Sequence, residues 1–290
     1  MAYIKSMIKQ VRGRFIKYNI KVIDNSNSLL RILDNNLSVV RFGDGEFDIL
    51  RGANIPYQNY DKKLALQMKK IILEGTNRQL LVCLPDIFKG MDRYNKDCRN
   101  FYYESFFYQN KKILHEIENT NNIYGSTFIS RPYIDLKDKR GADKYFKNLK
   151  QLWNNKDILI VEGEYTRSGE NNDLFNNAKS IRRIICPSQN AYSYLERIEN
   201  SILKNGVNRI VLLMLGPTAK IIVNDLYSTF PAQLIDLGHI DSEYEWFKMG
   251  ATKRVKIPNK HTAEFNNDDD MVKLKYDGKF DSEIIDQICL

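Results

Sequence analysis

The sequence predicts an α/β fold in which helices cover both faces of a doubly wound, mostly parallel sheet. Short β-rich runs alternate along the chain with longer segments whose apolar residues recur at helical spacing. Two of the runs, 158–161 and 210–215, are apolar without alternation, which is typical of strands buried on both faces of a parallel sheet. With 290 residues, of which 43% are hydrophobic, the chain can form one large domain.

Each expected strand is a short apolar run that ends at polar or glycine-bearing residues: Ser38–Phe42, Gln79–Leu84, Thr127–Ser130, Asp157–Glu162, Arg182–Cys186, Arg209–Leu215 and Gln233–Leu237. The expected helices lie between them: Ser26–Asn35, Lys62–Glu74, Arg99–Glu118, Ala142–Asn154, Ala191–Lys204, Thr218–Phe230 and Ser242–Lys248. Because crossovers between parallel strands are right-handed, the loops that follow the strands should share one edge of the sheet. Ligands bind at that edge in doubly wound sheets.

Three regions are expected along the chain. Residues 1–25 form a basic N-terminal segment, residues 26–250 the α/β domain, and residues 251–290 a C-terminal extension packed on that domain. The first segment lacks the continuous apolar core of a signal peptide and is expected to be a docked first helix or a peripheral contact with an anionic membrane surface.

The net charge of +8 narrows the class of partner only a little. The basic residues are scattered and many lie beside acidic ones, which is typical of a solvated surface or of a protein with an anionic substrate. No zinc spacing, aromatic RNA-binding motif or basic repeat is present, so nucleic acid is not expected as a partner.

Cysteine spacing and hydropathy indicate a cytoplasmic protein. The cysteines show no metal-ligand spacing, which favours a reducing compartment: Cys83, Cys98, Cys186 and Cys289. No run of about 18 apolar residues is present, so no segment is expected to span a membrane, and any membrane contact is expected to be peripheral, at the inner face.

The first strand end that could carry chemistry is the segment 41–46. Gly43 allows a sharp turn and close approach of a ligand beside Asp44. Asp44 and Glu46 could hold a metal ion, a ribose or a sugar hydroxyl, and Arg41 could bind a phosphate through its planar guanidinium. The alternative is a tight turn in which Glu46 opens a helix and pairs with Arg41.

Two further strand ends offer hydroxyl and basic groups. Thr166 and Arg167 follow the strand at 157–162 and could contact a phosphate or a base, or could lie on a surface turn. Ser188 follows the strand at 182–186 and is a candidate for ligand binding, although a helix cap near Ala191 is its favoured role.

The segment Gly216, Pro217, Thr218, Ala219 and Lys220 predicts a phosphate site, because it joins a buried strand to a helix. Gly216 permits close backbone approach, and Pro217 preorganises the first helical turn. The free N–H groups and the positive end of the helix dipole attract anions. The spacing of a Walker A loop is absent, so a diphosphate is expected here outside that motif.

The most acidic strand end is the segment 238–246. If the chain stays extended, Asp241 and Glu243 face the same side and supply hard oxygen ligands for Mg²⁺ or Mn²⁺. If a helix begins at Ser242, Asp241 instead neighbours Glu245. His239 could act as a base, a ligand or a hydrogen-bonding group. A capped acidic helix start with a structural histidine is the alternative.

A metal ion, a diphosphate site and an arginine together suit a nucleotide diphosphate-sugar. The diphosphate leaves as the glycosidic bond breaks, and a cation with fixed donors stabilises the charge that develops on it. A carboxylate or a histidine could then deprotonate the acceptor hydroxyl.

These motifs resemble the GT-D fold glycosyltransferases, formerly a domain of unknown function, from about Ser26 to Lys248. The runs that carry the resemblance are Ser38–Glu46, Ser126–Tyr133, Arg183–Ser188, Leu215–Lys220 and Gly238–Trp246. The resemblance implies a Rossmann-like fold, a UDP-sugar donor, dependence on Mn²⁺ or a similar ion such as Mg²⁺, and a D-x-E metal motif. It also implies an acceptor that is a bacterial surface glycan or glycoprotein.

The sequence contains two D-x-E triplets, and we assign the metal to Asp241 and Glu243. Asp44 and Glu46 form the competing triplet, which we assign to the donor. The base candidates are Glu245, His239 and Asp44. We expect transfer of a hexose, with glucose as the first candidate, and a second copy or other glycosyltransferases as candidate protein partners. The alternatives are another nucleotide-using α/β transferase and a non-catalytic nucleotide-sugar-binding subunit.

Overall fold

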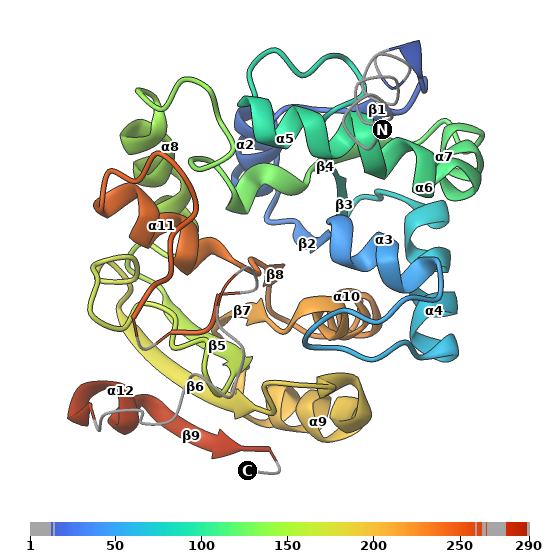
Figure 1. Cartoon of the computed structure of the whole chain (residues 1–290). Coiled ribbons are helices and arrows are strands. Elements are labelled where there is room, and N and C mark those ends of the chain that lie inside the picture. The colour runs from blue at the N-terminus through green and yellow to red at the C-terminus, as the bar shows by residue number, and fades with distance from the viewer. Residues whose placement is uncertain (1–12, 14, 259, 263–264, 266–276, 289–290) are drawn as a thin grey trace.

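One parallel sheet runs through the centre of the protein (Figure 1). The computed structural model describes residues 13, 15–258, 260–262, 265 and 277–288, which form a nine-stranded sheet in the order β1-β4-β3-β2-β8-β7-β5-β6-β9. Every pairing among these described strands is parallel. The expected doubly wound α/β fold is therefore confirmed.

The strands are β1 (Lys21–Val22), β2 (Ser38–Arg41), β3 (Leu80–Leu84), β4 (Ile123–Ser126), β5 (Asp157–Gly163), β6 (Ser180–Cys186), β7 (Ile210–Met214), β8 (Leu234–Asp236) and β9 (Ile284–Gln287). The α-helices are α2 (Asn25–Asn35), α3 (Asp44–Leu50), α4 (Lys62–Glu74), α5 (Lys96–Phe101), α6 (Phe107–Gln109), α7 (Lys111–Glu118), α8 (Ala142–Leu149), α9 (Leu195–Asn205), α10 (Gly216–Leu226), α11 (Ile240–Lys248) and α12 (Gly278–Glu283). Tighter or wider helical turns are η1 (a π-helix, Tyr102–Phe106) and the 3₁₀ turns η2 (Thr127–Ser130), η3 (Lys150–Leu152) and η4 (Ala191–Tyr194).

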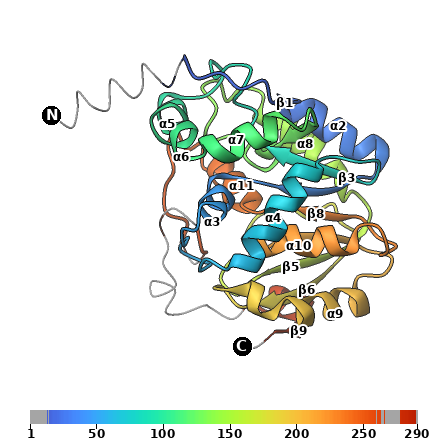
Figure 2. The same cartoon turned by 90° about the vertical axis from the view of Figure 1, so that its right-hand side faces the viewer.

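Helices cover both faces of the sheet, so successive strand residues enter two different apolar cores. Val40 belongs to an apolar core that includes side chains of α3, α4, α7, α9 and α10. Its neighbour Val39 belongs to a second core with side chains of α2, α8 and α11. Figure 2 shows α3, α4, α9 and α10 on the near side of the sheet. Burial on both faces explains why the strands read as continuous apolar runs.

One expected strand was placed too late in the sequence. Residues 127–130 form the 3₁₀ turn η2, and the strand β4 precedes them. Gly125 lets β4 pack tightly, since a Cβ there would lie 2.7 Å from the Cys83 Sγ atom of β3. Ser126 then ends the strand, because its hydroxyl accepts a hydrogen bond from the Phe128 N–H (3.1 Å) and starts the turn.

Both edges of the sheet come from the ends of the chain. β1, within the N-terminal segment 1–25, pairs with β4, and β9, within the C-terminal extension 251–290, pairs with β6. The predicted membrane contact of this N-terminal segment also involves residues 1–12 and 14, which lie outside the described residues. No helix in the described part of the chain is long and apolar enough to cross a membrane.

The strand order reverses at the seam between β2 and β8. β2, β3 and β4 lead away on one side, and β8, β7, β5 and β6 on the other. The two halves meet through a single pair of facing residues, Val39 and Ile235, whereas β5 and β6 pair over seven. A crevice opens at the carboxyl ends of the strands at such a reversal, which places the site.

Candidate functional site

A cavity of about 530 Å³ lies at the carboxyl ends of the strands, around the seam between β2 and β8. The segments that follow β2 to β8 all contribute to its walls, as do Thr252, Lys253, Arg254 and His261 after α11. The sequence-predicted residues that line it are Asp44, His239, Arg41, Gly43, Glu46, Thr166, Ser188, Gly216, Pro217, Lys220 and Asp241.

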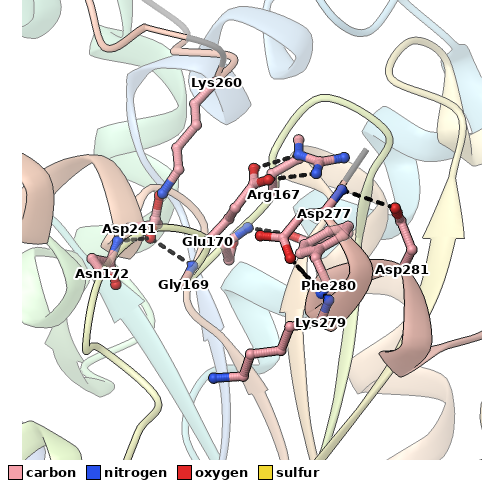
Figure 3. A network of polar contacts seen from close by, with 12 residues as sticks. Arg167, Gly169, Glu170, Asn172, Asp241, Lys260, Asp277, Lys279, Phe280 and Asp281 are labelled. Atoms are coloured by element: carbon pink, nitrogen blue, oxygen red, sulfur yellow. Dashed lines mark hydrogen bonds and ion pairs between the residues drawn. The ribbon is translucent and has the colours of Figure 1, made fainter. Parts of the chain in front are cut away.

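The remaining predicted residues lie outside this lining. Thr218 and Ala219 are fully buried on the inner side of α10. Arg167 forms an ion pair with Glu170, and its guanidinium lies 4.2 Å from the centre of the Phe280 ring (Figure 3). The side chains of Glu243 and Glu245 are held by other parts of the chain, as described below.

A buried ion network forms the floor of the cavity. Asp236, which ends β8 and is fully buried, accepts a hydrogen bond from Arg41 Nη2 at 2.9 Å and lies 3.0 Å from Lys220 Nζ. Arg41 also donates from Nε to the Asp236 carbonyl (2.8 Å) and from Nη1 to the Ser130 hydroxyl. Burial alone would raise the pKa of Asp236, but Arg41 and Lys220 outweigh it and lower the pKa.

Lys220 joins this network to α3. Its ammonium lies 2.8 Å from Glu46 Oε1, while Glu46 Oε2 accepts a hydrogen bond from the Gly43 N–H (2.8 Å). Glu46 therefore opens a helix, as the alternative interpretation expected, but its partner is Lys220, and Arg41 pairs with Asp236. The two cations that could have held a phosphate are thus neutralised by two buried carboxylates.

The amino end of α10 faces the cavity at Gly216 and Pro217. Gly216 has φ +49°, and a Cβ there would lie 2.6 Å from the Tyr57 ring, which packs directly over this turn. The loop that carries Tyr57 is tied to the end of β6, because the Tyr57 carbonyl accepts a hydrogen bond from the Asn190 N–H (2.9 Å). The dipole of α10 therefore points its positive end into a walled pocket.

The acidic segment forms a helix, α11, and its carboxylates diverge. Asp241 Oδ1 accepts hydrogen bonds from the Gly169 N–H (2.7 Å) and from Asn172, and Lys260 Nζ lies 2.8 Å from Oδ2 (Figure 3). Lys260 also bonds Glu245 Oε1 at 2.9 Å. Residues four apart on a helix are neighbours, so one lysine joins Asp241 and Glu245.

Glu243 points away from Asp241, toward the segment that follows η2. Its Oε2 atom accepts hydrogen bonds from the N–H groups of Tyr133 and Ile134, both at 3.0 Å, and Oε1 lies 3.7 Å from Arg131 Nε. Complete burial raises the pKa of Glu243 to about 7, against the opposing influence of Arg131.

This geometry does not fit a divalent ion shared by Asp241 and Glu243. Residues two apart on a helix face different directions, and Lys260 already neutralises the Asp241 carboxylate. Within the described ranges, no group of three or more His, Cys, Asp or Glu side chains is placed to hold a metal ion.

Asp44 is an acidic side chain that lines the cavity and is not tied up in an ion pair among the described residues. It lies in the first turn of α3 and is exposed to solvent there. Desolvation by the surrounding protein raises its pKa, Arg131 opposes that rise, and Glu46 adds to it. A carboxyl group that is accessible and less acidic than usual is suited to accept a proton.

One wall of the cavity is formed almost entirely by residues that the sequence did not predict as site residues. Asp135 lies 2.8 Å from Arg254 and 3.4 Å from Arg131, and all three line the cavity beside Phe101 and Tyr102. Arg131 and Asp135 come from the segment after β4, Phe101 and Tyr102 from α5 and η1, and Arg254 from the segment after α11. The strand misplaced at 127–130 obscured the role of Arg131 and Asp135 just after it, and no sequence motif marks Arg254.

Comparison with known proteins identifies the class. The family model described as the glycosyltransferase GT-D fold matches residues 39–265. A probable glycosyl transferase Gly of Streptococcus gordonii is 48% identical over 245 residues, which is 83% of this chain and 35% of that protein. Glycosyltransferase GlyD of Streptococcus pneumoniae is 45% identical over 274 residues, 92% of this chain and 31% of that protein. The chain spans about a third of the length of these relatives.

Solved structures agree with this result. A structure described as the highly conserved domain of unknown function 1792, with a distinct glycosyltransferase fold, superposes with a TM-score of 0.88 at 48% identity, covering 97% of this chain and 99% of that chain. A glycosyltransferase of Streptococcus sanguinis gives 0.88 at 47% identity, covering 93% and 100%. These matches define the class as a glycosyltransferase fold. The chain belongs to the GT-D fold glycosyltransferase family.

The ion network predicts a large loss of stability in Asp236→Asn. This substitution removes the negative charge between Arg41 and Lys220 and should lower the free energy of unfolding by about 3 to 5 kcal/mol, measured by urea denaturation. Asp143→Asn, which breaks an exposed ion pair with Lys147, is the control and should change it by about 1 kcal/mol at most. Equal effects of the two substitutions would contradict a structural role for the network.

The raised pKa of Glu243 predicts a pH-dependent stability that Glu243→Gln removes. The unfolded carboxyl ionises near its usual value of 4.5, whereas the folded one keeps its proton up to about pH 7. The free energy of unfolding of the wild type should therefore decrease as the pH rises from 4.5 to 7. The decrease relative to Glu243→Gln should be roughly 3 kcal/mol at most. Urea denaturation at pH 5 and pH 8 measures this difference. Parallel pH profiles of the two proteins would rule it out, and the exposed Glu74→Gln should keep the wild-type profile.

Proposed function

We propose that this chain transfers a hexose, with glucose as the first candidate, from a UDP-sugar to a glycan or glycoprotein acceptor of a bacterial surface. The observation that carries the proposal is the cavity at the seam, where the amino end of α10 and the accessible carboxyl of Asp44 face the same space. Membership of the GT-D family supports the reaction class. The bacterial relatives support the setting.

The donor diphosphate is assigned to the amino end of α10. A helix start binds phosphate oxygens through its free N–H groups and its dipole, and Gly216 and Pro217 at this start line the cavity. Thr166 and Ser188 line the same side of the cavity, at the ends of β5 and β6. Hydroxyl groups there can donate to phosphate or ribose oxygens.

Asp44 is assigned as the base, with His239 as the second candidate. In the proposed step Asp44 takes the proton of the acceptor hydroxyl, and the hydroxyl oxygen bonds to the anomeric carbon of the donor. The bond from that carbon to the diphosphate breaks, and UDP leaves with the electron pair. Its developing charge is stabilised at the start of α10. A raised pKa brings Asp44 closer to neutral pH, which favours proton transfer.

The dependence on Mn²⁺ or Mg²⁺ that the sequence predicts stays a prediction. The divergence of Asp241 and Glu243 gives no support to their sharing an ion, so no step here is routed through one. Protein partners, whether a second copy or other glycosyltransferases, likewise stay predictions.

A donor panel tests the reaction class. The full chain is incubated with UDP-glucose, UDP-galactose, GDP-mannose and CMP-sialic acid, with and without Mn²⁺ or EDTA, and free nucleotide is measured. We expect release of UDP from a UDP-hexose and none from the GDP- or CMP-sugars. Tight UDP binding without any release would instead indicate a non-catalytic subunit, and activity unaffected by EDTA would contradict the metal prediction.

Substitution of Asp44 tests the base. Asp44→Asn should lower kcat about 10²- to 10⁴-fold, with the KM for the UDP-sugar nearly unchanged, because the amide cannot accept the proton. Because the pKa of Asp44 is raised, the acidic limb of the wild-type rate profile should lie above the pH of about 3.9 typical of a free aspartate. Asp48→Asn, on the same helix but outside the cavity lining, should behave as wild type. Full turnover by Asp44→Asn would move the assignment to His239.

A further inference from the structure

The cavity has two ends on opposite sides of the seam. Thr166, Ser188 and Gly216 follow β5, β6 and β7, which lie on one side of β8. Asp97, Phe101 and Phe128 follow β3 and β4, which lie on the other side of β2. Neighbouring strands are about 4.8 Å apart, so the two ends are separated by several strand widths. Asp44 follows β2 and lies between them.

We propose that the end of the cavity beside β3 and β4 binds the acceptor as a saccharide ring, with Phe101 as the stacking platform. The inference rests on the proposed function, which places the donor diphosphate at α10. The base must then face the acceptor on the far side from α10. Arg131, Arg254 and Tyr102 are electrostatic neighbours of Asp44, and all of them line this acceptor end.

Phe101 is the exposed large apolar side chain, among the described residues, that lines the cavity. It is 41% exposed, although it borders the cavity and lies among buried aromatic residues. Tyr102 supports it edge-on, with ring centres 5.1 Å apart, and Phe106 lies 6.5 Å away. Ligand pockets are lined mainly by apolar and aromatic side chains, and an exposed ring at a cavity wall is available to contact a ligand.

The backbone beside Phe101 is unusual in the same place. α5 ends at Phe101 and continues as the π-helix η1, in which the Phe107 N–H bonds the Tyr102 carbonyl five residues back. A π-helical turn is rare and is frequently found at functional sites. The expected continuous helix 99–118 is therefore interrupted at the point where its side chains meet the cavity.

The chemistry of this end matches a sugar. A pyranose ring has a face of C–H groups and a rim of hydroxyl groups, so it fits an aromatic surface bordered by polar acceptors. Asp97 lies in the first turn of α5, is exposed, and forms no ion pair with any residue in the described ranges. Its carboxylate can accept hydrogen bonds from sugar hydroxyls while Phe101 packs against the C–H face.

The test compares Phe101→Ala, Phe101→Tyr and Tyr108→Ala in the full chain. Tyr108 is an exposed aromatic residue of α6 that lies outside the cavity lining, so it controls for loss of surface area. The probes are the methyl glycosides of glucose, galactose and N-acetylglucosamine, added to the UDP-hexose that the wild type cleaves. Release of UDP with and without glycoside separates transfer from hydrolysis.

We expect the KM for the stimulating glycoside to rise at least tenfold in Phe101→Ala. The KM for the UDP-hexose and the glycoside-free hydrolysis rate should stay within twofold, because Phe101 lies away from α10. Phe101→Tyr should restore the wild-type KM, and Tyr108→Ala should not change it. An unchanged glycoside KM in Phe101→Ala overturns the inference, and so does a tenfold rise in the donor KM.

A binding measurement keeps the inference independent of turnover. If the wild type releases no UDP from any UDP-sugar, the proposed function fails. In that case, or if no glycoside stimulates release, glycoside binding in the presence of UDP is measured by saturation-transfer NMR. This measurement tests the acceptor site without turnover. Saturation of the sugar ring protons that is lost in Phe101→Ala and kept in Tyr108→Ala supports the acceptor site. Absence of saturation in the wild type overturns it.

Discussion

The buried contact between Asp236 and two cations is the interaction on which the centre of the protein depends. β2 and β8 share only one pair of facing residues, so backbone pairing contributes little where the two halves of the sheet meet. Arg41 at the end of β2 and Lys220 on α10 both bind Asp236 at the end of β8. Breaking a buried ion pair leaves a buried charge without its partner, which is energetically costly. The network therefore stabilises the contact between the two halves of the sheet. Gly238 is part of the same arrangement, because a Cβ there would lie 2.0 Å from Arg41 Nη2.

The network also determines which side chains at the cavity are available to a ligand. Arg41, Lys220 and Glu46 line the cavity, yet each is held by an oppositely charged neighbour in its floor. Two acidic residues of α11 are engaged by backbone N–H groups: Asp241 accepts from Gly169, and Glu243 accepts from Tyr133 and Ile134. α11 is therefore a junction that positions loops on both sides of the cavity. The accessible carboxyl of Asp44 and the start of α10 are left to face the ligand.

Much of the fold could be predicted because burial on both faces leaves a strong apolar signal in the central strands. The apolar signal is missing where strands are not buried on both faces: β1 has two residues, and β9 is a half-exposed edge strand.

The site was harder to predict, since two interpretations of the acidic segment differ only in where a helix begins. α11 begins at Ile240, before Asp241, so the helical reading holds and Asp241 pairs through Lys260 with Glu245. Contacts between residues far apart in sequence, such as Arg254 with Asp135, leave no local pattern.

The segment after α11 shows why the site cannot be assigned to the α/β repeats alone. Arg254 binds Asp135 on the β4 side of the seam, and the His261 N–H bonds the Tyr165 carbonyl (2.7 Å) on the β5 side. Lys260 is anchored between them on α11. The described residues of this segment thus contact both halves of the sheet, and Arg254 and His261 line the cavity between them. The wall it forms requires both halves to be in place, so cavity and seam depend on each other.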